Sequence, residues 1–170
     1  MSAGFNPSLV ITNIPREGEN IWYPSVIDLA VHHSIPAIKC NKITDGGSIV
    51  ERIRDIAPDI LVVSSYRNIL GDYVLDLAKL GAINLHMAPL PKYRGAAPIN
   101  WAIINGETET GITTMKMNAG LDTGDILLSR KVPISNDDDA QSLHDILAQK
   151  GSSLVLETLK QLDSGSLDPI

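Results

Sequence analysis

The sequence predicts an α/β fold in which a mostly parallel, open sheet is covered by helices on both faces. Short apolar runs such as residues 60–63 alternate with segments of helical periodicity through the first two thirds of the chain. Strands that are apolar along their whole length are typical of parallel sheets, because both faces of such a sheet are buried. Of the 170 residues, 44% are hydrophobic and 20% are charged, so we expect a single folded domain over residues 1–170.

The expected elements follow one another in a regular order up to residue 86. Strands are predicted at residues 9–12, 36–40, 60–63 and 82–85, and helices at residues 24–33, 48–56 and 71–80. Ser48 is the expected N-cap of the second helix, and Pro58 follows its end. Strand and helix therefore alternate, as they do in parallel α/β sheets.

The pattern changes after Gly106. Two runs at residues 112–117 and 125–134 alternate with period two, and the segment between them is rich in turn-forming residues. A long helix is predicted at residues 140–162, directly after three aspartates at positions 137–139. Acidic residues at a helix N-terminus accept hydrogen bonds from free amides and complement the helix dipole. We therefore interpret these aspartates as helix caps and expect no metal site.

Composition and charge exclude several classes of function. The net charge of −6 and the absence of a basic block disfavour nucleic acid as the primary ligand. The single cysteine, Cys40, rules out an intrachain disulfide and is expected to pack in the interior. The sequence has no signal-peptide pattern and no apolar stretch of membrane-spanning length, so we expect a cytoplasmic protein with no membrane partner. It also lacks a glycine-rich phosphate loop and a nucleophile elbow.

The residues best suited to chemistry lie between positions 84 and 124. Asn84 and His86 end a predicted strand and, because strand side chains alternate, they point to the same side. Ligands of open α/β sheets bind beyond the carboxyl ends of the strands. Asp122 belongs to a second, turn-rich loop, in which Gly120 and Gly124 allow close approach to a ligand.

These three side chains could form an acyl-transfer site. The Asn84 amide and His86 would face the developing oxyanion, while Asp122 would orient His86 and help to remove a proton from an attacking amine. No serine or cysteine nucleophile is needed, because the amine itself attacks. Each residue taken alone also fits a structural role, as a turn former, a hydrogen-bonded core histidine or an Asx-turn aspartate. Spacing alone does not show that the two loops meet, and we assign structural roles to the other histidines, His32, His33 and His144.

Four segments in this order resemble the folate-dependent formyltransferases. The matching residues are 84–99, 111–117, 120–127 and 142–145, and the resemblance extends from about residue 9 almost to the last residue. Within the family, the closest likeness is to the catalytic domain of the methionyl-tRNA-type enzymes. The resemblance implies a Rossmann-type, formyltransferase-like fold.

The resemblance also implies an activity, which is the transfer of a formyl group from 10-formyltetrahydrofolate to an amine, with Asn84, His86 and Asp122 as catalytic residues. It further implies that the folate lies against three short segments. These are Asn68, Ile69 and Leu70; Ala88, Pro89, Leu90 and Pro91; and Ala119, Gly120 and Leu121. The resemblance implies no metal cofactor.

Several positions depart from the pattern of the family. Arg67 stands where relatives commonly carry glycine, and Ala88 where they commonly carry serine. The family's first strand and helix have no counterpart before residue 9, which predicts a gap or a different pairing in the middle of the sheet. No counterpart of the C-terminal domain that helps the methionyl-tRNA-type enzymes to hold tRNA follows the matched region either.

The acceptor expected from these features is a small amine, such as an amino sugar, or an aminoacyl group. A tRNA acceptor is allowed by the resemblance but is disfavoured by the acidic charge and the unmatched C-terminal domain. Two alternatives stay open. The chain could be a non-catalytic remnant that binds folate or a partner, or a subunit that another chain, including a second copy in a homo-oligomer, completes with a strand.

Overall fold

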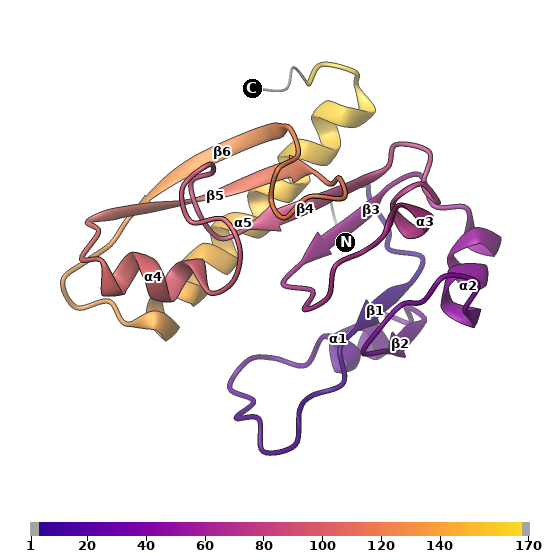
Figure 1. Cartoon of the computed structure of the whole chain (residues 1–170), viewed down its shortest axis with the longest axis horizontal. Coiled ribbons are helices and arrows are strands. Elements are labelled where there is room, and N and C mark those ends of the chain that lie inside the picture. The colour runs from indigo at the N-terminus through magenta and orange to yellow at the C-terminus, as the bar shows by residue number, and fades with distance from the viewer. Residues whose placement is uncertain (1–3, 168–170) are drawn as a thin grey trace.

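The computed structural model describes residues 4–167 as an α/β domain (Figure 1). The strands of the described part are β1 (Val10–Thr12), β2 (Ala37–Lys39), β3 (Leu61–Ser64), β4 (Ala82–His86), β5 (Glu109–Lys116) and β6 (Ile126–Pro133). The helices are α1 (Val26–His32), α2 (Ser48–Ile56), α3 (Asp72–Leu75), α4 (Pro98–Ile104) and α5 (Ala140–Asp163). Every strand and helix expected from the sequence is present, and α4 is the one described helix that the sequence pattern did not predict.

The strands form two sheets. β1 and β2 pair in parallel, and a separate four-stranded sheet has the order β3-β4-β5-β6. Within the larger sheet β3 and β4 are parallel, whereas β5 and β6 are antiparallel to their neighbours. The pairing is parallel among the first four strands, as predicted, and it is antiparallel for β5 and β6. Only residues 117–125 connect β5 to β6, which is too short for the crossover that a parallel pair requires.

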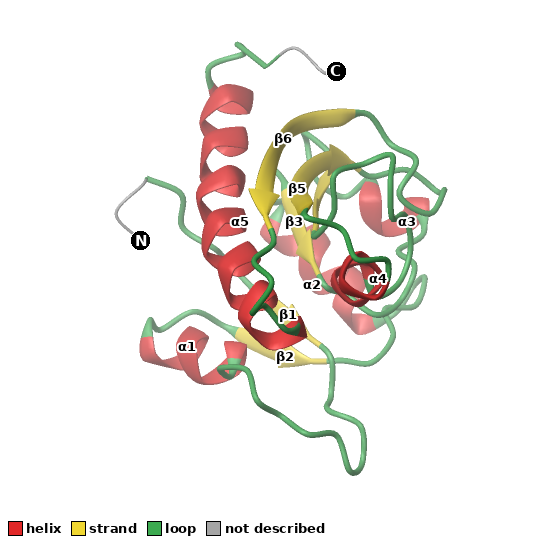
Figure 2. Cartoon of the chain, turned by 90° about the vertical axis from the view of Figure 1, so that its left-hand side faces the viewer, coloured by secondary structure: helices red, strands yellow, loops and turns green. Residues whose placement is uncertain are grey.

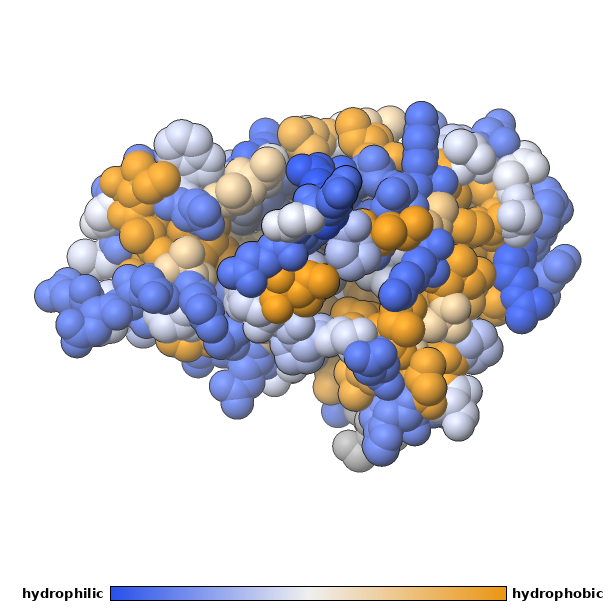
Figure 3. Space-filling view, turned by 90° about the horizontal axis from the view of Figure 1, so that it is seen from below, coloured by the Kyte–Doolittle hydropathy of each residue, from blue (hydrophilic) through white to orange (hydrophobic). Residues whose placement is uncertain are grey.

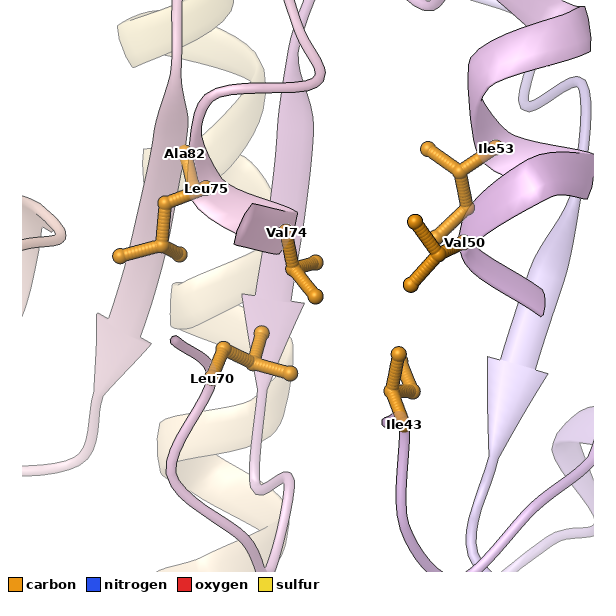
Figure 4. Packing of buried hydrophobic residues seen from close by; sticks show 7 residues of the cluster. All are labelled: Ile43, Val50, Ile53, Leu70, Val74, Leu75 and Ala82. Carbon is orange, nitrogen blue, oxygen red and sulfur yellow. The ribbon is translucent and has the colours of Figure 1, made fainter. Parts of the chain in front are cut away.

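The two sheets lie side by side without hydrogen bonds between β1 and β3 in the described residues. This arrangement agrees with the gap expected in the middle of the sheet. One apolar cluster nevertheless spans the gap, because Ile11 of β1 and Val63 of β3 pack against the same buried residues. Figure 4 shows those residues, which are Ile43, Val50, Ile53, Leu70, Val74, Leu75 and Ala82. Helix packing thus links the two sheets where strand pairing does not.

Helices cover both faces of the molecule, as predicted (Figure 2). α2 and α3 pack on one face through the cluster just described. α5 packs on the other, where its Leu143, Leu147 and Leu154 meet Leu85 of β4. A Cβ atom at Gly151 of α5 would lie 2.7 Å from the Leu85 side chain, so glycine permits this close approach. Because Leu85 faces α5, its neighbours Asn84 and His86 face the side of α2 and α3.

Two local predictions are corrected, and one short helix was not predicted. α3 ends at Leu75 and not near residue 80, because the N–H groups of Lys79 and Leu80 donate to Pro58 and Asp59 at the start of β3. The N-cap of α2 is Gly47, with Ser48 as the first helical residue. The short helix α4 begins with Pro98, a residue type that favours the first turn and was the signal available in the sequence.

Of the three aspartates predicted to cap α5, Asp139 is the one that caps it. Asp139 accepts hydrogen bonds from the N–H groups of Gln141 (2.9 Å) and Ser142 (2.8 Å), and the Ser142 hydroxyl completes a capping box. These bonds, with that of Ser142 first, lower the pKa of the Asp139 carboxyl. Across residues 4–167 no helix combines the length and the apolar character needed to cross a membrane.

Candidate active site

The candidate site lies at the carboxyl end of β4. Asn84 and His86 project from the same face of the strand, opposite Met115 and Thr113 of β5 in the strand register. His86 is buried, with 7% of its surface exposed, whereas Asn84 is half-buried. The Asn84 side chain makes no hydrogen bond within the described part of the chain. Its amide is therefore free to meet a ligand.

Both ring nitrogens of His86 lie near acceptor oxygens. Nε2 is 2.8 Å from the main-chain carbonyl oxygen of Tyr93, and Nδ1 is 3.6 Å from Oδ2 of Asp122. A carbonyl oxygen only accepts hydrogen bonds, so Nε2 carries the hydrogen in the first contact. The second distance is within ion-pair range but longer than a hydrogen bond. When Nδ1 also carries a hydrogen, a modest movement of either side chain would bring it into hydrogen-bonding contact with Asp122.

Asp122 is held in place by its backbone and by a neighbouring loop. It adopts a left-handed conformation with φ of 49°, and its Oδ2 accepts a 2.8 Å hydrogen bond from the N–H of Gly95. The turn around it is made by Asn118, whose Oδ1 accepts from the N–H of Gly120 (2.9 Å) and the hydroxyl of Thr123 (2.8 Å). Asn118 therefore forms the local Asx turn, which leaves the Asp122 carboxylate to face His86.

The structure thus brings the two loops together, which spacing alone could not establish. Gly124 lies so close to Lys116 that a Cβ atom would collide with the Lys116 carbonyl oxygen, so glycine lets the second loop fold back beside β5. The first loop is tied to β5 by Thr113, whose hydroxyl donates to the Ala88 carbonyl (2.7 Å) and accepts from the Leu90 N–H (3.2 Å). Sequence reasoning did not identify Thr113.

The residues expected to contact folate differ in their exposure to solvent. Ile69 and Leu121 are 77% and 62% exposed, and Asn68, Pro91, Ala119 and Gly120 are also exposed. Pro89 is half-buried, whereas Leu70, Ala88 and Leu90 are buried and belong to the interior. The side chains of these buried residues are closed to a ligand, so they could only shape the site from beneath.

A hollow lies in the loops that follow β1, β2 and β3. It encloses about 220 Å³ and is lined by Asn13, Ile14, Pro15, Arg16, Asn41 and Arg67. The Asn68 side chain donates to the Asn41 carbonyl oxygen, and the Ile14 N–H donates to Asn41 Oδ1 (2.9 Å). Figure 3 views the molecule from the side on which the loop after β1 lies, where apolar and polar side chains are interspersed.

An ion pair joins the loop after β1 to the loop after β3. Both terminal nitrogens of Arg67 donate to the Glu19 carboxylate, which also accepts hydrogen bonds from the Arg16 N–H (2.8 Å) and the Tyr23 hydroxyl (3.0 Å). The bonds from Arg67, followed by the one from Arg16, lower the pKa of Glu19 to about 2. Arg67 therefore has a structural partner in this chain.

Comparison with known proteins agrees with the fold. The family model described as formyl transferase matches residues 39–159. Methionyl-tRNA formyltransferase of Caldanaerobacter subterraneus is 44% identical over 169 residues, covering 98% of this chain and 55% of the relative. The enzyme of the same name from Geobacter sulfurreducens is 52% identical over 150 residues, covering 88% of this chain and 47% of the relative. This chain therefore spans about half the length of these curated relatives.

Solved structures share the fold at lower sequence identity. A phosphoribosylglycinamide formyltransferase from Bacillus halodurans superimposes with a TM-score of 0.77 at 24% identity, covering 91% of this chain and 79% of the other. The formyltransferase PseJ from Anoxybacillus kamchatkensis, solved with a UDP-linked formamido sugar and tetrahydrofolate, gives 0.68 at 23% identity, with coverages of 95% and 79%.

The fold is that of an α/β protein, and the candidate site lies at the carboxyl end of β4, where ligands of open α/β sheets bind. The chain belongs to the formyltransferase family. The comparisons leave the roles of individual residues open.

Proposed function

We propose that this chain transfers a formyl group from 10-formyltetrahydrofolate to an amine, with Asn84, His86 and Asp122 as catalytic residues. The observation that carries the proposal is the approach of His86 Nδ1 to Asp122 Oδ2, at 3.6 Å, at the carboxyl end of β4 in a chain of the formyltransferase family. An imidazole, a carboxylate and a free amide at one strand end suit acyl transfer to an amine.

The reaction needs one carbon–nitrogen bond to form and another to break. The acceptor amine attacks the formyl carbon, and the bond from that carbon to N10 of the folate then breaks. The amine loses a proton and N10 gains one, so no net proton or electron is required. The Asn84 amide donates to the oxyanion while it exists, because its side chain makes no other hydrogen bond within the described residues. His86 keeps its Nε2–H on the Tyr93 carbonyl and presents Nδ1 to Asp122, and Asp122 relays the proton, directly or through water.

The exposed residues at the rim of the site fit a flat, partly apolar substrate. Ile69 and Leu121 expose large aliphatic side chains close to residues that also expose main-chain groups, such as Gly120. A pterin ring offers an apolar face together with polar edges, and sites of this kind pair apolar walls with a few main-chain hydrogen bonds. The tetrahydrofolate present in the PseJ structure supports folate as the substrate.

For the acceptor, the names of the curated relatives favour the aminoacyl group of methionyl-tRNA. The net charge of −6 favours a small amine instead, and the formamido sugar in the PseJ structure supports that second candidate. We place the aminoacyl acceptor first, because those relatives are 44% and 52% identical to this chain whereas PseJ is 23% identical.

The test begins with calorimetric binding of a stable folate analogue to the parent, His86→Ala and Asp122→Asn. We expect all three to bind the analogue and only the parent to release tetrahydrofolate at an appreciable rate when 10-formyltetrahydrofolate and an acceptor are supplied. Binding without turnover by the parent would support the alternative of a folded module that binds folate but does not catalyse. Failure of the parent to bind at millimolar analogue would contradict the folate proposal itself.

A further inference from the structure

Tyr93 contacts the candidate site through its main chain and the segment between α4 and β5 through its side chain. Its main-chain carbonyl oxygen is 2.8 Å from His86 Nε2. Its hydroxyl donates to Glu107 Oε1 at 2.6 Å and accepts a hydrogen bond from the Asn105 amide at 3.1 Å. Glu107 and Asn105 lie in the segment between α4 and β5, outside the loop that carries Tyr93. The side chain thus fixes the loop from outside, while the main chain contacts the catalytic imidazole.

The conformation of Tyr93 makes this anchor necessary. Its φ is 58°, in the left-handed region that a tyrosine rarely adopts. Such a conformation persists only where surrounding contacts hold it. The Glu107 carboxylate provides such a contact, and accepting this hydrogen bond raises the pKa of the Tyr93 phenol.

Residues 93–95 contact both members of the His86–Asp122 pair. The Tyr93 carbonyl contacts His86 Nε2, and the Gly95 N–H donates to Asp122 Oδ2 at 2.8 Å. One short stretch of main chain therefore sets the hydrogen on the imidazole and the direction of the carboxylate. A shift of this stretch would disturb both groups together.

On the basis of the function proposed above, the geometry assigns to Tyr93 the role of a positioning residue, whose side chain, anchored at Glu107 and Asn105, holds His86 and Asp122 in their reactive arrangement. Tyr93 does this without contacting the reacting atoms through its side chain. Its carbonyl selects the Nε2–H form of the imidazole, so that Nδ1 is the nitrogen presented to Asp122.

The test compares Tyr93→Phe with Glu107→Ala, Glu107→Gln and a control, Tyr73→Phe. The control also removes a tyrosine hydroxyl. The Tyr73 hydroxyl donates to the Ile43 carbonyl (2.9 Å) in the apolar cluster through which α2 and α3 pack. The first measurement is the ¹⁵N NMR signals of the His86 ring in the free protein, assigned by their loss in His86→Ala. We expect these signals to shift in Tyr93→Phe and Glu107→Ala, and to stay at the parent positions in Glu107→Gln and Tyr73→Phe.

The second measurement is turnover, where we expect kcat to fall about tenfold to a hundredfold in Tyr93→Phe and Glu107→Ala, with little change in the KM for the folate. Unshifted His86 signals in both of those variants would overturn the assignment. If Tyr93→Phe does not fold, Glu107→Ala alone decides the question. Because the NMR comparison needs no substrate, a parent without turnover would contradict the proposed function while leaving this assignment to be judged by the ring signals.

Discussion

At the scale of single residues, the loop that carries Asp122 divides its tasks between neighbours. Asn118 supplies the oxygen that closes the turn, and Gly124 permits the close approach to Lys116. Asp122 itself contacts the other loop, through the Gly95 N–H and the His86 ring. A carboxylate needed for its own turn could not also be directed across the site, so the Asx turn at Asn118 is a condition for the proposed chemistry.

Thr113 gives a prediction at this scale. It is fully buried, lies opposite His86 in the strand register, and bridges Ala88 and Leu90 through its hydroxyl. Thr113→Val keeps the shape of the side chain but leaves the Ala88 carbonyl and the Leu90 N–H without that partner, so we expect a loss of about 1–3 kcal/mol in the free energy of unfolding. Thr113→Ser, which keeps the hydroxyl, should lose less. Urea denaturation measures both, and a Thr113→Val variant as stable as the parent would show that the hydroxyl bridge does not contribute to stability.

At the scale of elements, the loops after β1 and β3 are joined by charge. Glu19 and Arg67 are far apart in the sequence, and Arg67 also lines the hollow together with Arg16 and Asn41. Both Glu19 and Arg67 belong to segments without helical or strand periodicity, so nothing in the sequence pattern paired them.

The lowered pKa of Glu19 predicts an acid-sensitive contribution to stability. Glu19 has a pKa of about 2 in the folded protein against 4.5 as its ordinary value, so the unfolded state takes up the proton first as the pH falls. The stabilisation is complete above about pH 4.5 and is lost as the pH approaches about 2. We therefore expect Glu19→Gln to lower the Tm at pH 7 and the difference from the parent to shrink on acidification through this window.

Glu17→Gln is the matched control for that titration, because Glu17 lies in the same loop, is exposed, and makes no ion pair within the described residues. Thermal unfolding at several pH values compares the three proteins. A Tm difference for Glu19→Gln that stays constant from pH 7 to pH 3 would show that the carboxylate charge is not responsible.

At the scale of the whole molecule, the sequence predicted the α/β class, the order of the elements and most of their bounds. α5 begins at the predicted Ala140 because Asp139 has the chemistry of a cap. The ends of helices were harder to predict. α3 stops at Leu75, and beyond it the N–H groups of Lys79 and Leu80 donate to the distant Pro58 and Asp59. The antiparallel pairing of β5 with β6 follows from the short connection between them, which a reading of periodicity alone did not weigh.

The candidate site, like the fold, could be predicted from the sequence only in part. Asn84, His86 and Asp122 could be named from residue type and family resemblance, and the structure places the last two within 3.6 Å of each other. The contacts of Tyr93 and Thr113 with the site could not be foreseen. They depend on the course of the main chain, such as the φ of 58° at Tyr93, and residue types at these positions give no sign of it.

The separation of the two sheets leads to a prediction for the whole molecule. The Val10 N–H donates to Pro36 of the β2 side and the Leu61 N–H to Gly81 of the β4 side. Because backbone groups alternate between the two edges of a strand, the N–H groups of Ile11 and Val62 point to the edges that lack a strand partner in residues 4–167. Unpaired strand edges are open to solvent or to another strand.

Amide hydrogen exchange followed by NMR measures this directly. We expect Ile11 and Val62 to exchange at least about tenfold faster than their paired neighbours Val10 and Leu61, because an amide without a partner needs no opening step before it exchanges. Equal protection of all four amides would mean that a strand pairs with these edges in solution. The mass of the particle at the same concentration then distinguishes a second copy of the chain from a rearrangement within one copy, since only the former doubles the mass.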